Sequence, residues 1–316
     1  MSRRLNSHAA QLFAGRREFI LGGASLAVLP WMGRFVLGAP GNTGGLSDYP
    51  FPLGVASGDP TEDGMVLWTR LSPRPLEGGG MPAESFEVTW ELADDEAMKN
   101  IVRRGTAWAT PQLGHSIHVE LEGLDPNRWY WYRFRLGDAE SPVGRTRTMP
   151  ARDTMPEQLR FAFASCQHYE HGLFTAYDHM LSDELDLIVH LGDYFYEYEG
   201  KEKQIRKHTG SETTSLEDYR NRHALYRLDP HLQAAHGHCP WLVVWDDHEF
   251  DNNCACDISE ESGVSCEDFL LRRANAYQAY YEHMPLRRRS LPLGPDMKLY
   301  RKITFGRLAD FFMLDT

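Results

Sequence analysis

Three short apolar segments of this 316-residue sequence are each followed by side chains that can bind metal ions. These side chains are Cys166 after the first segment, Asp193 and Tyr196 after the second, and Asp246, Asp247, His248 and Asn253 after the third. In open α/β sheets, functional groups gather where the strands end at their carboxyl edge. We therefore expect a thiol, several carboxylates, a phenol and an imidazole to lie together at one edge of a sheet.

The mixture of ligand types indicates the chemistry of this edge. Carboxylates that crowd together without a cation raise one another's pKa, and a bound cation removes that penalty. Thiolate and phenolate ligands favour an oxidised or softer transition metal such as iron, whereas carboxylate and amide oxygens suit Ca²⁺, Mg²⁺ or Mn²⁺. A mixed metal site of this kind would activate a water molecule and neutralise phosphoryl oxygens during an in-line displacement.

Each of these residues also has a purely structural interpretation. A cysteine such as Cys166 at a strand end is usually a small buried hydrophobe. Asp193 after Gly192 fits a turn, and the pair Asp246-Asp247 fits the N-terminus of a helix. For any single residue the structural interpretation is the stronger one. Four such coincidences at three strand ends favour the metal site.

The elements that must position these residues are buried strands alternating with helices. The three apolar segments, residues 159–164, 185–191 and 241–245, lack polar alternation, which is typical of strands buried on both faces. Helices are expected at residues 173–180, 216–226 and 267–281, and a fourth apolar segment spans residues 308–314. This alternation predicts a layered α/β domain over residues 158–316.

Residues 49–150 have a different periodicity. Apolar and polar residues alternate over 86–92 and 117–122, and the turn Asp125-Pro126-Asn127 introduces the aromatic segment 129–136. Short alternating strands separated by turns predict an antiparallel β-sandwich, and the late strands are similar to those of a fibronectin-type module. The aromatic segment fits a carbohydrate-binding platform, but a sandwich core accounts for it more simply.

Charge and cysteine content narrow the class of protein. With 33 basic and 45 acidic residues the chain has a formal charge of −12, which argues against a nucleic-acid binder. It does not exclude a phosphorylated substrate, provided that metal ions reverse the potential inside one pocket. Five cysteines are too few for a disulfide framework. Two of the residues Cys254, Cys256 and Cys266 could form a disulfide in an oxidising compartment, and free thiols are the alternative.

The first forty residues have the features of an export signal. Arg16-Arg17 stands directly before a modestly apolar segment, residues 19–32, which predicts a twin-arginine (Tat) signal over residues 1–40. A transmembrane anchor is the alternative, but the apolar segment is shorter than the ~20 residues that a span needs, and Arg34 interrupts it. Residues 41–48 are expected to be a linker. The predicted location is the periplasm or the cell exterior, with the Tat machinery as a partner and membrane contact only during export.

The motifs together resemble those of the PhoD-type alkaline phosphatases, which are related to the calcineurin-like and purple-acid phosphatases. Residues 192–197 (GDYFYE) and 245–249 (WDDHE) are similar to this family's signatures. So are residues 51–60 with 66–70, 165–167, and 223–226 with 229–230. The resemblance implies a two-domain protein, with a fibronectin- or immunoglobulin-like sandwich before an αββα-layered metallophosphatase domain. It also implies hydrolysis of phosphate esters outside the cytoplasm with one Fe³⁺ and two Ca²⁺.

The resemblance further assigns roles to individual residues. Cys166, Asp193 and Tyr196 would bind iron, with Asp193 bridging to calcium. Asp247 would occupy a metal-ligand position, and His248 would donate a proton to the leaving oxygen. The weaker ligand candidates are Asp246 and Asn253. Arg220 and Arg222 would bind phosphate oxygens, although a solvated helix face is the other use for this charged stretch.

The family continues well beyond the position of Thr316, and its later strands supply further histidine and aspartate ligands. We therefore expect a metallophosphatase domain that is incomplete at its C-terminus. The leading prediction is an exported phosphatase acting on phosphate monoesters and also on diesters. One alternative is a phosphodiesterase or phospholipase D-like esterase on the same fold, and another is a non-catalytic remnant that serves as a binding module.

Overall fold

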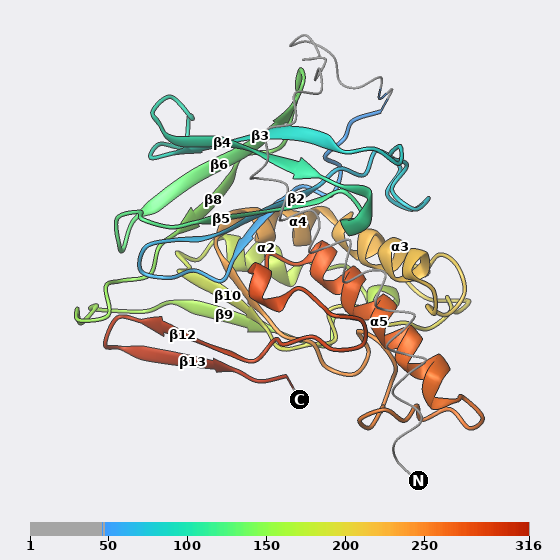
Figure 1. Cartoon of the computed structure of the whole chain (residues 1–316). Coiled ribbons are helices and arrows are strands. Elements are labelled where there is room, and N and C mark those ends of the chain that lie inside the picture. The colour runs from blue at the N-terminus through green and yellow to red at the C-terminus, as the bar shows by residue number, and fades with distance from the viewer. Residues whose placement is uncertain (1–45, 47, 316) are drawn as a thin grey trace, which may run out of the picture.

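The computed structural model describes residues 46 and 48–315 (Figure 1). The predicted export signal at residues 1–40 lies outside the described residues, as does most of the predicted linker. Figure 1 shows an antiparallel sheet at the top of the view, a two-stranded hairpin at the lower left, and one long helix that runs down to the lower right. Among the described residues, no helix is both long and apolar enough to cross a membrane.

The first sheet is antiparallel and has five strands. They are β3 (Phe86–Ala93), β4 (Ile101–Ala109), β6 (Trp129–Leu136), β7 (Ala139–Glu140) and β8 (Gly144–Arg147). Along β6 intermediate and buried residues alternate without a break, so the aromatic segment is a half-buried strand. Its tyrosines, Tyr130 and Tyr132, belong to the core beneath the sheet. The core interpretation of the aromatic segment therefore holds for these two residues.

The second sheet is mixed and has six strands in the order β5-β2-β1-β11-β10-β9. Its antiparallel half consists of β1 (Val55–Gly58), β2 (Met65–Arg70) and β5 (Ser116–Leu121). Its parallel half consists of β9 (Phe161–Ala164), β10 (Leu187–His190) and β11 (Trp241–Val243). The two halves meet where Gly58 in β1 pairs with Trp241 in β11. Strands from residues 49–150 and from residues 158–316 thus share one sheet.

The three predicted buried strands differ in their burial. All residues of β10 and β11 are buried, as the absence of polar alternation predicted. The prediction is wrong for β9, in which Phe161 and Phe163 are 45% and 65% exposed. The physical reason is position, because β9 is the edge strand of the sheet. The ring of Phe311 packs against Phe161, with centroids 5.3 Å apart, and covers part of this face.

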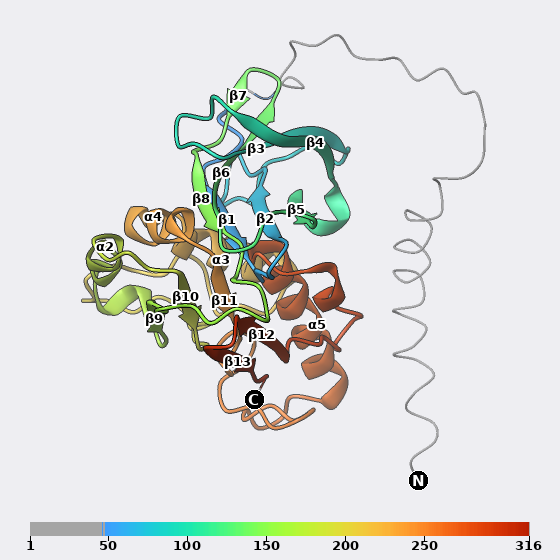
Figure 2. The ribbon, with the colours of Figure 1, turned by 90° about the vertical axis from the view of Figure 1, so that its left-hand side faces the viewer.

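The hairpin next to this face is formed by β12 (Arg301–Phe305) and β13 (Ala309–Met313). The predicted fourth apolar segment, residues 308–314, therefore contains a strand. Within the described residues, the hairpin is a separate two-stranded sheet. Figure 2 shows it beside the parallel half of the mixed sheet.

The helices are α2 (Ala176–Leu181), α3 (Leu216–Arg227), α4 (Pro230–His238) and α5 (Cys266–His283). Short 3₁₀ turns occur at Pro111–Leu113, Tyr169–His171 and Arg288–Ser290. Three of these helices were predicted within a few residues, whereas α4 was not. Its signal was Asp229-Pro230, because Asp229 caps the backbone N–H groups of His231 and Leu232 and Pro230 is the first helical residue. Ser215 and Ser265 cap α3 and α5 in the same way.

Candidate metal centre

The loops that follow β9 and β10 are joined by backbone hydrogen bonds. The N–H of Cys166 donates to the carbonyl of Gly192 at 3.2 Å, and the N–H of Gln167 donates to the carbonyl of Asp193 at 3.1 Å. Cys166 and Asp193 both have a left-handed backbone, with φ of 55° and 52°. Residues other than glycine rarely adopt this conformation, and it is found where a side chain must be directed into a functional site. The predicted approach of these two strand ends is confirmed.

The side chain of Glu249 connects the loop after β10 with the loop after β11. Its carboxylate accepts hydrogen bonds from the backbone N–H groups of Tyr194 (2.6 Å), Asp246 (2.9 Å) and Asp193 (3.0 Å). Burial raises the pKa of Glu249 to about 8, in opposition to these N–H groups, which favour the carboxylate. The loops approach so closely that a Cβ on Gly192, where φ is +109°, would lie 2.5 Å from the backbone nitrogen of Asp246. Only glycine fits this position.

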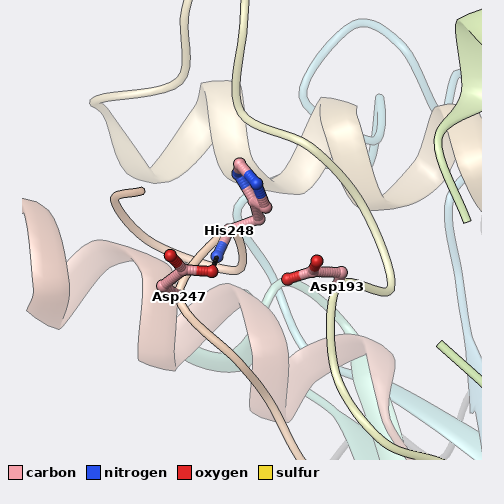
Figure 3. Close-up of side chains that lie close together, drawn as sticks. All are labelled: Asp193, Asp247 and His248. Atoms are coloured by element: carbon pink, nitrogen blue, oxygen red, sulfur yellow. Dashed lines mark hydrogen bonds between the residues drawn. The ribbon is translucent and has the colours of Figure 1, made fainter. Parts of the chain in front are cut away.

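Three side chains from these loops converge. Ligand-capable atoms of Asp193, Asp247 and His248 all lie within 4.8 Å of one another. Figure 3 shows the carboxylates of Asp193 and Asp247 pointing toward each other. Two facing carboxylates repel unless a positive charge lies between them. Oδ1 of Asp193 is buried and has no hydrogen-bond partner among the described residues. A buried, unpaired carboxylate oxygen is costly, so this arrangement fits a cation.

Tyr196 and Cys166 also contact Asp193. The hydroxyl of Tyr196 donates to Oδ2 of Asp193 at 3.1 Å, and burial together with the Asp193 charge raises the pKa of this phenol. A hydrogen bond from Ser165 lowers the pKa of Cys166, but burial and the interaction with Asp193 outweigh it, so the pKa is raised. Both groups would be ionised only beside a strong positive charge. Thiolate, phenolate and carboxylate are the ligand types that the sequence predicted for iron.

Glu197 holds the imidazole of His248. Nδ1 of His248 is 2.8 Å from Oε2 of Glu197, which is buried. Burial alone would lower the pKa of His248, but the hydrogen bond and charge of Glu197 raise it above its ordinary value. The ring also packs on Tyr196, with centroids 4.1 Å apart. Because Glu197 occupies Nδ1, Nε2 is the nitrogen left to face a reacting group.

Asp246 and Asn253 lie at the edge of the cluster. Burial raises the pKa of Asp246, and so do the charges of Asp193 and Asp247. The backbone N–H of Asn253 donates to Oδ2 of Asp247 at 2.6 Å, and its side-chain amide donates to Glu260 at 2.8 Å. The carboxylate of Asp246 is therefore near enough to feel the charges of Asp193 and Asp247. Asn253 contacts Asp247 through its backbone N–H group.

The structure gives Arg220 and Arg222 other partners than phosphate. Arg220 forms two hydrogen bonds of 2.6 Å with the carboxylate of Glu282 on α5. Arg222 is buried and donates to the backbone carbonyls of Tyr196, Tyr198 and Ser211. Neither side chain is a solvated helix face, and neither is free to bind phosphate. The reason is packing: α3 lies against α5, to which Arg220 is bound, and Arg222 supports the chain that follows β10.

Two residues that support the centre, Glu197 and Glu249, were missed as functional residues. Both stand inside the motifs at residues 192–197 and 245–249. The sequence could have shown that these motifs contain more carboxylates than metal ligands require. It could not show which carboxylates face a cation and which face a histidine or backbone N–H groups. Each of the five cysteines, all of which are described, is a free thiol in the structure.

Comparisons with known proteins agree with this geometry. The family described as "PhoD-like phosphatase" matches residues 161–316, and its N-terminal domain matches residues 39–150. "Alkaline phosphatase D" of Bacillus subtilis (strain 168) is 55% identical over 313 residues, which covers 95% of this chain and 53% of that protein. A solved "Structure of PhoD" superposes with a TM-score of 0.84 at 59% identity and covers 86% of this chain and 53% of that one.

The chain thus spans about half the length of the relatives that it matches. The match to the solved structure supports the two-domain, strand-rich fold of that protein. On this similarity of both sequence and fold, the chain belongs to the PhoD-like phosphatase family.

Proposed function

We propose that this chain carries a metal-dependent phosphatase centre that hydrolyses phosphate monoesters. The observation that supports it most is the convergence of Asp193, Asp247 and His248, together with the buried, unpaired Oδ1 of Asp193. Facing carboxylates beside an imidazole suit cation-assisted attack of water on phosphorus. Family membership gives the same reaction class. Because the chain spans about half of its relatives, the activity of the whole protein is part of the proposal.

The proposed cofactors are one Fe³⁺ and two Ca²⁺. Cys166, Asp193 and Tyr196 would bind the iron, because their thiol, carboxylate and phenol lie in contact. Asp193 and Asp247, with Asp246 and the carbonyl oxygen of the Asn253 side chain nearby, offer the oxygen ligands that calcium prefers. When bound, these ions would lower the pKa of a water molecule and neutralise the charge on the phosphoryl oxygens.

His248 supplies the proton in this proposal. Glu197 holds the ring through Nδ1 and favours its protonated form, so Nε2 carries a proton that can pass to the leaving alcohol oxygen. A protonated leaving group departs as a neutral alcohol, which lowers the barrier. Glu197 acts through His248 and is a positioning residue.

Export completes the proposal. Arg16-Arg17 before the apolar segment at residues 19–32 supports passage through the Tat machinery to the periplasm or cell exterior. Calcium is plentiful outside the cytoplasm, so a centre with oxygen ligands for calcium is consistent with export. The expected substrates are small phosphate esters, and contact with the membrane is limited to export.

Two finer fold assignments belong to the same proposal. We interpret the core between the five-stranded antiparallel sheet and strands β1, β2 and β5 of the mixed sheet as a fibronectin-like sandwich. We interpret the facing of β9 and β13, through Phe161 and Phe311, as the start of the two central sheets of an αββα metallophosphatase.

Activity of the full chain loaded with iron and calcium tests the function. We expect hydrolysis of p-nitrophenyl phosphate, with slower hydrolysis of bis(p-nitrophenyl) phosphate. Asp193→Asn should lose both iron and turnover, whereas the exposed carboxylate variant Asp183→Asn should keep both. A folded chain that binds both metals and hydrolyses neither ester would refute the proposal. Faster hydrolysis of the diester would assign the phosphodiesterase alternative, and folded chain without affinity for either metal would leave the binding-module alternative.

A further inference from the structure

Arg227 is a buried cation without a carboxylate partner. It is the last residue of α3 and follows the motif at residues 223–226, to which the proposed function gives no role. Only 1% of its surface is exposed. Nη1 donates to the hydroxyl of Tyr194 at 3.2 Å, and the guanidinium lies 4.4 Å from the ring of Trp68. Its Nε and Nη2 have no hydrogen-bond partner among the described residues.

The other buried arginines have partners for most of their nitrogens, either backbone carbonyls, as at Arg70 and Arg222, or carboxylates. Arg272 binds Asp251 at 2.8 Å, and Arg301 binds Asp59 at 2.7 Å. Around Arg227, by contrast, the groups that favour its charged form are the phenols of Tyr194 and Tyr132, and burial lowers its pKa. A buried charge without a counter-charge is among the most costly features that a fold can contain.

Two histidines near Arg227 are also buried and unpartnered. They are His223, through both ring nitrogens, and His236, through Nδ1, with no partner in the part of the chain that the structure describes. Each is at most 2% exposed. The Tyr194 hydroxyl, which accepts from Arg227, is 2.9 Å from Nε2 of His236, and the Tyr194 ring lies 6.2 Å from that of His223. The charge of Arg227 lowers the pKa of His223, His236 and Tyr132. The hydroxyls of Tyr132 and Ser57 form a hydrogen bond with each other, which leaves one of their two protons for a further partner.

These groups share one property: all of them can donate a hydrogen bond. Arg227 offers three N–H donors on Nε and Nη2, the bonded pair of hydroxyls leaves one more, and each neutral histidine offers one. No carboxylate is among them. A cluster of buried donors around one positive charge matches an anion, whereas a water molecule would leave the charge uncompensated.

We propose that Arg227, through Nε and Nη2, binds one small monovalent anion, chloride being the available one, with the hydroxyl pair of Tyr132 and Ser57 as a further donor. One negative charge neutralises one guanidinium. A phosphate ion carries up to two charges and four strongly hydrated oxygens, so its desolvation in this closed place would cost more than one cation returns.

The position of this anion site gives it a structural role. Ser57 lies in β1 and Tyr132 in β6, both from the first region, whereas Arg227 lies in α3 of the second region. Tyr194, which receives the hydrogen bond from Arg227, directly follows Asp193. The anion would therefore stabilise the junction of the two regions behind the candidate metal centre. It does not depend on the proposed phosphatase activity.

Bromide locates the site directly. Crystals of the full chain grown in sodium bromide should give an anomalous peak within hydrogen-bond distance of Nη2 of Arg227. A difference-density feature without anomalous signal would be water, and it would overturn the proposal.

Thermal unfolding tests the energetics. At equal ionic strength, replacing gluconate by chloride should raise the Tm by about 2 °C or more, because only the folded state binds the ion. Arg227→Met should abolish this chloride response. Arg272→Met, which removes a carboxylate-paired arginine, should lower the Tm and retain the response. If Arg227→Met does not fold, Ser57→Ala is the milder variant and should weaken the response. An equal chloride response in wild type and in the folded variants of the site would refute the anion.

Discussion

In the first region, residues 49–150, the buried polar atoms that lack a partner among the described residues are mainly hydroxyls of serine, threonine and tyrosine. In the second, residues 158–316, they include carboxylate oxygens of Asp193 and Asp251, guanidinium nitrogens of Arg227 and both ring nitrogens of His223. The second region also contains 11 of the 14 histidines and all five cysteines. The first region is built for packing, whereas the second retains groups whose charge or hydrogen bonds call for a ligand.

The two regions are nevertheless one structure, because β1 lies between β2 and β11 in a single sheet. All residues of β1 and β2 are buried. One face packs in the sandwich core, and the other contributes Ala56 and Trp68 to a small cluster with Ala224 of α3. The indole of Trp68 donates to the carbonyl of Glu282 at 3.1 Å.

The largest expected effect therefore comes from separating the regions. A fragment of residues 49–150 should not fold, since one face of β1 and β2 would lose its cover. We expect a poorly dispersed amide NMR spectrum and no cooperative thermal transition, whereas the full chain should unfold in one transition. A well-dispersed spectrum of the fragment would show that the first region is an independent domain.

Within the second region, Glu249→Gln should have the next largest effect. The carboxylate serves three backbone N–H groups, and an amide presents a donor to some of them. Each buried N–H left unpaired costs about 1–3 kcal/mol, so we expect a loss of roughly 3–6 kcal/mol in the free energy of unfolding. Iron and calcium content should fall as well, because the loops that carry Asp193 and Asp246 separate.

The matched control for this variant is Glu184→Gln, which changes an exposed carboxylate of the same region. Its stability and metal content should equal those of the wild type. Normal metal content in Glu249→Gln would mean that the loops do not need Glu249 to hold their geometry.

A core variant of the first region should show the opposite selectivity. Leu92 in β3 is fully buried in the sandwich core. Leu92→Ala should lower the free energy of unfolding by roughly 2–4 kcal/mol through lost burial and a residual cavity. Metal content per folded molecule and KM should stay unchanged. A drop in metal affinity would show that the packing of the sandwich is transmitted to the centre.

The same contrast explains what the sequence could predict. Buried β10 and β11 and the approach of Cys166, Asp193 and Asp247 followed from apolar runs that end in polar groups, and the structure confirms this proximity. Their role as metal ligands stays a prediction. The exposure of Phe163 could not be predicted, because it depends on which strand forms the edge of the sheet.

The partners of individual charges were equally beyond the sequence. Arg220 binds Glu282, which is 62 residues away along the chain, and Glu197 turns toward His248 instead of toward Asp193 and Asp247. A pattern of residue types predicts where a charged side chain lies on its own helix, strand or loop. Its interaction partner depends on how these segments pack in three dimensions.

The smallest expected effect concerns acid stability, to which the second region contributes more because it holds most of the histidines. Burial lowers the pKa of His190 and of His208 to about 3, so both stay neutral in the folded state well below the ordinary histidine value. The unfolded chain takes up these protons near pH 6.5. The stabilisation from keeping these histidines neutral is therefore fully present above about pH 6.5. It falls as the pH drops toward the pKa values of the folded state, by about 1.4 kcal/mol per pH unit for each such histidine.

His190→Gln should reduce the slope of the free energy of unfolding against pH by one such contribution. Urea titrations between about pH 5 and 7, where carboxylates of the unfolded chain titrate least, measure this slope. His179→Gln, at an exposed position of the same region, should leave the slope unchanged, and equal slopes in the two variants would mean that His190 is protonated in the folded protein.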